Sequence, residues 1–164
     1  MTTPDSETGF VLGFDSAGVR MTPEEFDAID DYDDTYYYEL VDGVLVVRPL
    51  AAPSESSACE MLGYWLWKYG DKDPLGKSLD ATVYGEYLNT KNSRRRTDRA
   101  VWTGLGRRPR ANQDTPTIVV DFVSSGKRCW LQDYNKKRWE YAEIGVREYW
   151  IIDRFQRTLT VYLF

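Results

Sequence analysis

Two aspartates in this chain stand at positions where acidic side chains are unusual. Asp121 lies inside the apolar run 117–123, which predicts a buried strand, and Asp98 precedes the short apolar run 100–102. Taking a carboxylate out of water is costly unless a cation or hydrogen bonds compensate its charge. Short acids on neighbouring strands can converge on one ion, and Mg²⁺ prefers oxygen ligands. The two aspartates are therefore candidate ligands of a hydrolytic metal site that holds Mg²⁺ or Mn²⁺.

Phosphodiester hydrolysis at such a site also uses a cation that positions the attacking water or stabilises the pentavalent phosphate. The helix predicted over 131–144 carries Lys136, Lys137 and Arg138 in succession, and we expect it to pack back across the sheet. On an amphipathic helix, two of three successive charges face solvent, so one of the three can reach the site. Glu39 could complete the metal shell, either directly or through water.

Each candidate also has a purely structural interpretation. Asp98 could be a surface acid paired with Arg95 or Arg99, and Glu39 could simply end a strand. A buried Asp121 is harder to explain without a functional role, because ionisable groups with perturbed surroundings concentrate at functional sites.

The chain has no histidine and two cysteines. This composition excludes the usual serine and cysteine triads, zinc sites built on imidazole, and a four-cysteine zinc site. An enzyme built from this sequence must use carboxylates, lysines, tyrosines and hard-metal ions.

The elements that would position these side chains are those of an α/β domain. Apolar periodicity and turn signals predict the helices 22–31, 54–69 and 131–144 and the strands 36–40, 44–49, 82–88, 99–103, 117–123, 147–152 and 158–163. Residues 1–20 are expected to form a flexible leader, and 21–164 a single domain. The fold class predicted is a mixed β-sheet flanked by helices.

The net charge of −5 is unevenly distributed along the chain. Residues 1–43 hold twelve acidic residues and one basic residue, whereas 91–110 hold eight basic residues and one acid, Asp98. The basic run predicts a surface that contacts nucleic-acid phosphates through Arg94, Arg95, Arg96 and Arg99. The alternative is an ordinary solvated loop.

Location and assembly are predicted from composition. No apolar run approaches the ~20 residues of a membrane span, and the N-terminus has no signal core, so we expect a cytoplasmic protein without a membrane partner. The chain holds twelve Tyr, six Trp and six Phe, and the stretch 36–38 is three tyrosines. We expect that stretch to be exposed, and with the high aromatic content it predicts a homodimer.

Five segments in order resemble one family, the Uma-type putative restriction endonucleases of the PD-(D/E)XK nuclease superfamily. They are M-T-P-E-E-F at 21–26, Y-E-L-V-D-G at 38–43, T-D-R-A-V-W at 97–102, I-V-V-D-F-V-S at 118–124, and the stretch 133–153 from D-Y-N-K-K-R-W to E-Y-W-I-I-D. The resemblance implies a restriction endonuclease-like fold, a Mg²⁺- or Mn²⁺-dependent nuclease acting on DNA, and a site made of Glu39, Asp98, Asp121 and Lys137.

The chain departs from the family pattern at several positions. Asp121 stands where the family usually has Glu, Thr97 stands where many relatives have Pro, and Ser57 lies near a slot that often holds His. Val123 fills the position where the plain superfamily motif has its lysine, so the lysine must come from elsewhere, and Lys137 is the candidate. The departures leave open an alternative function, a catalytically degenerate module that binds a partner.

Overall fold

The chain forms two compact units, which are described separately. The computed structural model describes residues 11–110, 112–123 and 130–164. Of these, the residues up to Leu50 together with Asn92–Arg94 form the first unit, and Ala51–Lys91 with Arg95–Phe164 form the second. The domain predicted over 21–164 contains parts of both units. Residues 1–10 of the predicted leader lie outside the described residues.

The first unit is built around a β-hairpin. Strand β1 (Tyr36–Val41) pairs antiparallel with β2 (Val44–Pro49). The two turn residues, Asp42 and Gly43, have φ of 49° and 72°, the left-handed conformation that an Asp-Gly pair adopts most readily in a two-residue turn. The register of the hairpin therefore follows directly from the sequence.

Two short helical turns accompany the hairpin. Residues Phe14–Ser16 form the 3₁₀ turn η1. Helix α1 (Pro23–Asp27) begins with a capping box, in which Thr22 Oγ1 accepts from the Glu25 N–H (3.1 Å) and Glu25 Oε2 accepts from the Thr22 N–H (2.7 Å). The sequence predicted this start, but the helix ends at Asp27 rather than near residue 31.

The tyrosine-rich stretch of β1 belongs to the core of the first unit. Tyr38 is 5% exposed, packs with Leu12 and Leu45, and donates a hydrogen bond from its hydroxyl to the Leu12 carbonyl (3.1 Å). Tyr36 and Tyr37 are half-buried. The stretch is therefore not the exposed surface from which the homodimer was predicted.

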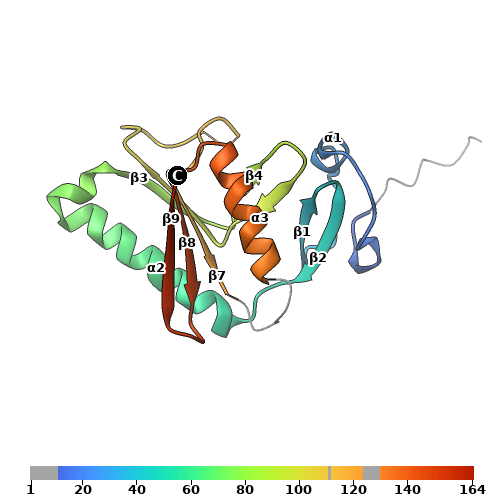
Figure 1. Cartoon of the computed structure of the whole chain (residues 1–164), viewed down its shortest axis with the longest axis horizontal. Helices are drawn as coiled ribbons and strands as arrows, with labels where there is room; N and C mark the ends of the chain where they lie inside the picture. Colours follow the sequence, from blue (N-terminus) through green and yellow to red (C-terminus); the bar gives the residue numbers. More distant parts are fainter. Residues whose placement is uncertain (1–10, 111, 124–129) are drawn as a thin grey trace, which may run out of the picture. The chain divides into compact units, whose positions relative to one another are not determined.

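The second unit contains a five-stranded sheet, seen in Figure 1. Its strands are β3 (Leu79–Tyr84), β6 (Arg99–Thr103), β7 (Ile118–Phe122), β8 (Glu148–Asp153) and β9 (Thr158–Leu163), in that spatial order. Strands β7 and β8 are parallel, and the other neighbours are antiparallel. A parallel pair needs a crossover, which is provided here by α3 (Trp130–Glu143).

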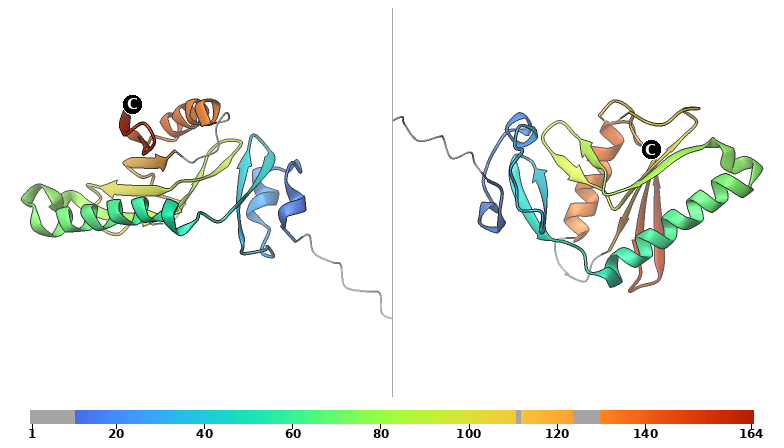
Figure 2. Two further views of the ribbon diagram at one scale, coloured as in Figure 1. Left: turned by 90° about the horizontal axis from the view of Figure 1, so that it is seen from below. Right: turned by 180° about the vertical axis from the view of Figure 1, so that it is seen from behind.

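The two long helices cover opposite faces of this sheet, as Figure 2 shows. Helix α2 (Pro53–Lys72), followed by the 3₁₀ turn η2 (Pro74–Ser78), packs along β3. On the other face, Tyr141 of α3 packs against Val119 of β7 and Tyr149 of β8. Residues paired across strands share a face, and Val119 pairs with Tyr149 as Asp121 pairs with Ile151. Asp121 therefore lies on the face that α3 covers.

Two short strands differ from the prediction. The strand expected over 82–88 is interrupted at Gly85, which has a φ of 70°, so that β3 is followed by a separate β4 (Tyr87–Asn89). The basic run contains β5 (Arg94–Arg96), which was not predicted. Arg94 pairs with Leu40 of β1 within the first unit, and β4 neighbours β5.

The fold class predicted from the sequence is confirmed. The described residues form a mixed α/β fold with two β-sheets and three α-helices. Among these residues, no helix is both long enough and apolar enough to span a bilayer.

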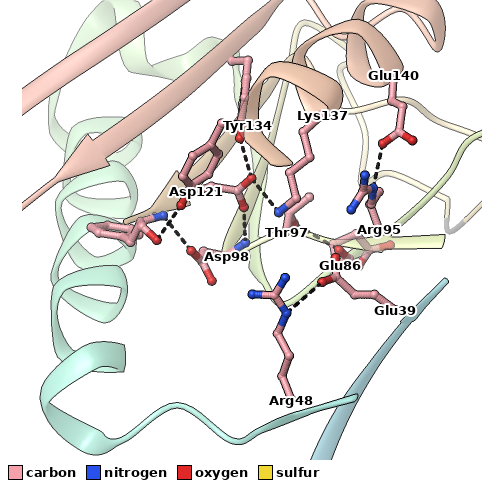
Figure 3. Close-up of polar contacts among 12 residues, drawn as sticks. Glu39, Arg48, Glu86, Arg95, Thr97, Asp98, Asp121, Tyr134, Lys137 and Glu140 are labelled. Carbon is pink, nitrogen blue, oxygen red and sulfur yellow. Dashed lines mark hydrogen bonds and ion pairs between the residues drawn. The ribbon is translucent and has the colours of Figure 1, made fainter. Parts of the chain in front are cut away.

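The ion pair between Arg95 and Glu140 ties the basic run to α3 and provides a test of the fold. Arg95 is fully buried, and its Nε donates to Glu140 Oε2 at 2.6 Å (Figure 3). Removing one partner of a buried pair leaves an uncompensated charge, so we expect Glu140→Ala to lower the free energy of unfolding by about 3–5 kcal/mol. Glu143→Ala, at an exposed position of the same helix, should change it by less than about 0.5 kcal/mol. Urea unfolding measures both variants, and equal losses would show that the pair does not anchor α3.

Candidate active site

Asp98 and Asp121 lie side by side on neighbouring chain segments (Figure 3). Asp121 is the fourth residue of β7, and Asp98 directly precedes β6, whose first residue, Arg99, pairs with Val120. The Asp98 N–H donates to Asp121 Oδ1 (3.2 Å), and the Phe122 N–H donates to Asp98 Oδ2 (2.6 Å). This reciprocal pair of bonds fixes both carboxylates relative to the backbone.

The other oxygen of Asp121 is held by two side chains. Asp121 Oδ2 accepts from Lys137 Nζ on α3 (3.1 Å) and from the Tyr149 hydroxyl on β8 (2.8 Å). Asp121 is 2% exposed and Lys137 is 7% exposed. A buried carboxylate thus receives a full charge and two further hydrogen bonds, which offset its desolvation.

Two of the three successive cations of α3, which are adjacent in the sequence, contact different groups. Lys137 points to Asp121, whereas the Arg138 guanidinium lies over the Tyr162 ring, 4.4 Å from its centroid. Val123 is buried in the core cluster that contains Tyr141 and Tyr149. The structure thus places the ammonium group of Lys137, rather than a side chain at position 123, against Asp121.

Tyr149 is a site residue that was not predicted from the sequence. Its hydroxyl is a neutral donor, because burial and the neighbouring Asp121 raise its pKa well above its ordinary value. The signal that could have identified it is the alternation of β8. In the pairing of β8 with β7, Tyr149 lies opposite Val119 and therefore on the face of Asp121.

Asp98 differs from Asp121 in its surroundings. Burial, followed by repulsion from Asp121, raises the pKa of Asp98 to about 6, while the Phe122 N–H, Lys137 and Arg96 act in the opposite direction. Asp98 Oδ2 is bonded to Phe122, but among the described residues Asp98 Oδ1 has no hydrogen-bond donor. Asp98 also lines a hollow of about 80 Å³. Its free oxygen is therefore an available ligand.

The donor set fits a hard divalent ion with few protein ligands. Asp98 Oδ1 and the remaining lone pair of Asp121 Oδ1 are carboxylate donors, and Mg²⁺ is commonly held by one or two carboxylates with water in the other positions. In the part of the chain that the structure describes, no cluster of three or more acidic, cysteine or histidine side chains could hold a metal. This unit thus offers a metal ion two carboxylates at most.

Glu39, the fourth residue of the predicted site, lies in the first unit, whereas the other three lie in the second. It is 6% exposed, and Arg48 Nε lies 3.7 Å from its Oε2 within the same hairpin. The structure thus gives the buried Glu39 an exposed ion-pair partner, and its role as a metal ligand stays a prediction.

The four arginines predicted to contact phosphate are held mostly inside the protein. Arg94 makes a forked ion pair with Asp27, Arg95 is paired with Glu140, and Arg99 Nε donates to the Cys59 carbonyl (3.1 Å). Arg96, whose guanidinium lies over the Tyr84 ring, is the only one of the four that is not buried. The solvated-loop alternative does not describe these residues, and phosphate contact stays a prediction that Arg96 fits best.

Arg99 also fixes the approach of α2 to the sheet. Its Nη1 donates to Thr82 Oγ1 (3.2 Å), and its guanidinium lies against Gly63 of α2. A Cβ placed on residue 63 would lie 2.6 Å from Arg99 Cζ, closer than real contacts allow. The absence of a side chain at Gly63 therefore lets the guanidinium sit between helix and sheet.

Comparison with known proteins decides the family. Residues 23–163 match the model of the Uma2 family, which is described as “Putative restriction endonuclease”. The chain belongs to this family. The match spans both units and includes every residue of the predicted site.

A solved structure gives independent support for the fold. The crystal structure of a putative nuclease of the DUF820 family from Anabaena variabilis ATCC 29413 superposes with a TM-score of 0.70 at 13% identity, over 87% of this chain and 79% of that chain. At this identity the likeness concerns the fold alone. The curated proteins contain no match to this chain.

The raised pKa of Asp98 makes a prediction about stability. The pKa of Asp98 is 3.8 ordinarily and about 6 in the folded chain, so as the pH rises Asp98 ionises first in the unfolded chain. The free energy of unfolding therefore falls as the pH rises through this window, and the loss is constant above it. Without metal, Asp98→Asn should raise the free energy of unfolding by on the order of 3 kcal/mol at about pH 8 and leave it nearly unchanged at about pH 4. Asn can still accept from the Phe122 N–H.

Thermal unfolding across this pH range checks the expectation, with Asp71→Asn at an exposed position of α2 as the matched control. An equal gain for Asp98→Asn at both ends of the range would show that the effect does not come from ionisation of Asp98.

Proposed function

We propose that this chain is a metal-dependent endonuclease that hydrolyses phosphodiester bonds in DNA, with Mg²⁺ or Mn²⁺ as its cofactor. The single observation that carries the proposal is the cluster of Asp98, Asp121 and Lys137, in which two carboxylates and an ammonium group meet and Asp98 lines a hollow. Membership of the Uma2 family supports a nuclease as the class of protein.

Asp98 and Asp121 would hold the metal ion. When bound, the ion lowers the pKa of a coordinated water and neutralises charge on the phosphate oxygens. The protein prepares this site in two ways. The Phe122 and Asp98 N–H groups fix the directions of the two carboxylates, and burial of Asp98 makes its ionised form costly in the absence of a cation.

Lys137 and Tyr149 both donate to Asp121 Oδ2, but we assign them different roles. Tyr149 is a neutral donor that holds the carboxylate in place from β8. Lys137 brings a positive charge from α3, and its ammonium donates to Asp121. A cation at this place can orient the attacking water or stabilise the negative charge that develops on the phosphate.

One observation favours the alternative, a nuclease-fold module that binds a partner without cleaving it. Asp121 Oδ2 already accepts two hydrogen bonds from Lys137 and Tyr149, so this part of the cluster is satisfied without a metal. A site that needs no ion for its stability could survive the loss of catalysis. Activity and metal binding therefore have to be measured together.

A cleavage assay on plasmid and single-stranded DNA with Mg²⁺ or Mn²⁺ tests the proposal. We expect the unmodified chain to cleave, Asp98→Asn and Asp121→Asn to abolish cleavage and Mn²⁺ binding, and Lys137→Ala to lower the rate by about 10²–10³-fold while Mn²⁺ still binds. Matched controls are Asp71→Asn and Lys72→Ala, at exposed positions of α2.

The outcomes separate the two functions. Binding of DNA without cleavage under either metal would favour the binding module over the nuclease. Full activity of Asp121→Asn would show that this cluster is not the catalytic site, and neither binding nor cleavage of DNA would overturn the proposal.

Arg96 gives a second prediction, about affinity. Its side chain is half-buried, and the other three arginines of the run are buried. If Arg96 contacts a phosphate, Arg96→Ala should weaken DNA binding. It should also make the negative slope of log K against log salt less steep by about 0.9. Arg147→Ala, at an exposed position before β8, is the control. A salt series with equal slopes for the parent and both variants would remove Arg96 from the interface.

A further inference from the structure

The hollow beside Asp98 has a positively charged group in its lining. It is formed by residues of α2, β3, the ends of β7 and β8, and the segment before α2: Ala51, Ser56, Cys59, Tyr84, Asp98, Phe122, Val123 and Arg154. Among these lining residues, Asp98 and Arg154 are the two with charged side chains. A phosphate group bound to a metal on Asp98 would thus meet Arg154 within the same hollow.

The backbone at Arg154 is held firmly. Asp153, the last residue of β8, is 7% exposed, and its Oδ1 accepts from the N–H groups of Phe155 (2.8 Å) and Gln156 (2.9 Å). This bonding closes the turn between β8 and β9. The Arg154 guanidinium lies over the Phe155 ring, 5.2 Å from its centroid, a cation–π contact that restricts its direction.

The parallel pairing of β7 and β8 brings the end of each strand to the same edge. Phe122 pairs with Ile152, and the Val123 N–H donates to the Ile152 carbonyl (2.9 Å). Asp121 and Arg154 therefore lie near the carboxyl ends of adjacent parallel strands, the edge at which α/β proteins commonly bind ligands. Arg154 is in the second unit, as are Asp98, Asp121 and Lys137.

We propose that Arg154 is a phosphate-binding residue that contacts a non-bridging oxygen of the phosphodiester held at Asp98 and Asp121. The inference rests on the proposed function. Arginine remains charged at all working pH values and matches phosphate oxygens with a planar fork of donors. Lys137 and Arg154 then serve different groups, since Lys137 is bonded to Asp121, whereas Arg154 reaches the hollow from the turn after β8.

This assignment has a consequence for the reaction. During hydrolysis the attacking water loses a proton to solvent as its oxygen bonds to phosphorus, the bond to the leaving oxygen breaks, and that oxygen takes up a proton from solvent. Negative charge accumulates on the non-bridging oxygens before the leaving oxygen departs. A guanidinium that donates to one of them stabilises both the bound phosphodiester and the transition state, so its removal should affect affinity and rate.

The test uses a ligand with a single phosphate. Thymidylyl-thymidine and its methylphosphonate counterpart, which lacks one charged non-bridging oxygen, are titrated onto the full chain in Ca²⁺, with Arg154→Ala, Arg154→Lys and the control Arg147→Ala. We expect the parent and Arg147→Ala to bind the phosphodiester about tenfold more tightly than the methylphosphonate. Arg154→Ala should show a clearly smaller preference, because only the metal and Lys137 then favour the charged ligand, and Arg154→Lys should restore part of the difference.

Cleavage and Mn²⁺ binding complete the test. Arg154→Ala should keep the parent's Mn²⁺ affinity and lose about 10²-fold in cleavage rate. If the parent cleaves DNA and Arg154→Ala keeps both its rate and its preference for the charged ligand, the inference on Arg154 is wrong and the proposed function stands. If the parent does not cleave, the proposed function fails. A parent that binds the two dinucleotides equally, or binds neither, overturns the role of Arg154.

Discussion

The placement of a carboxylate inside an apolar strand is the constraint on which the second unit depends. Asp121 is 2% exposed, with Val119 and Val120 fully buried beside it in β7. A charge in such a place is tolerated only with several donors around it, and here they come from three different elements. The Asp98 N–H approaches from the start of β6, Lys137 from α3 and the Tyr149 hydroxyl from β8. The two carboxylate oxygens of Asp121 thus constrain how α3, β6 and β8 pack around β7.

The β7–α3–β8 crossover supplies two of these donors at once. A crossover helix returns over the sheet that it connects, so the middle of α3 passes above the strand it has just left. Lys137 lies at that point and Tyr149 lies in the strand that follows. The packing of Tyr141 against Val119 and Tyr149 keeps helix and strands in this relation. The packing that forms the hydrophobic core therefore also places Lys137 and Tyr149 beside Asp121.

The sequence singles out residues that conflict with their local pattern. Asp121 interrupts an apolar run, and Asp98 stands before another, so both could be identified without knowing how the strands pair. It could not separate Lys137 from its neighbours, because the rotation of a helix about its axis is set by packing. Tyr149 was missed for a related reason. Its alignment with Asp121 depends on the register of β7 and β8, which neither strand specifies alone.

For the basic run, the local sequence pattern was misleading. A local cluster of arginines is typical of a solvated or phosphate-binding surface, yet Arg94 and Arg95 are paired with Asp27 and Glu140, which lie 67 and 45 residues away in the chain. No local pattern shows such partners. The break at Gly85 is also set by distant partners, because β3 before it belongs to the five-stranded sheet and β4 after it to the four-stranded sheet.

Gly63 has a significance beyond the packing of Arg99. The guanidinium of Arg99 fills the space that a Cβ at residue 63 would need, and α2 carries Ser56 and Cys59 on the wall of the hollow beside Asp98. The separation of α2 from the sheet, and with it the width of the hollow, therefore depends on the Arg99 guanidinium and the missing side chain at Gly63. Gly63 lies two helical turns from Ser56. A change at this remote pair of positions, Arg99 and Gly63, would therefore alter the width of the hollow without altering Asp98, Asp121 or Lys137.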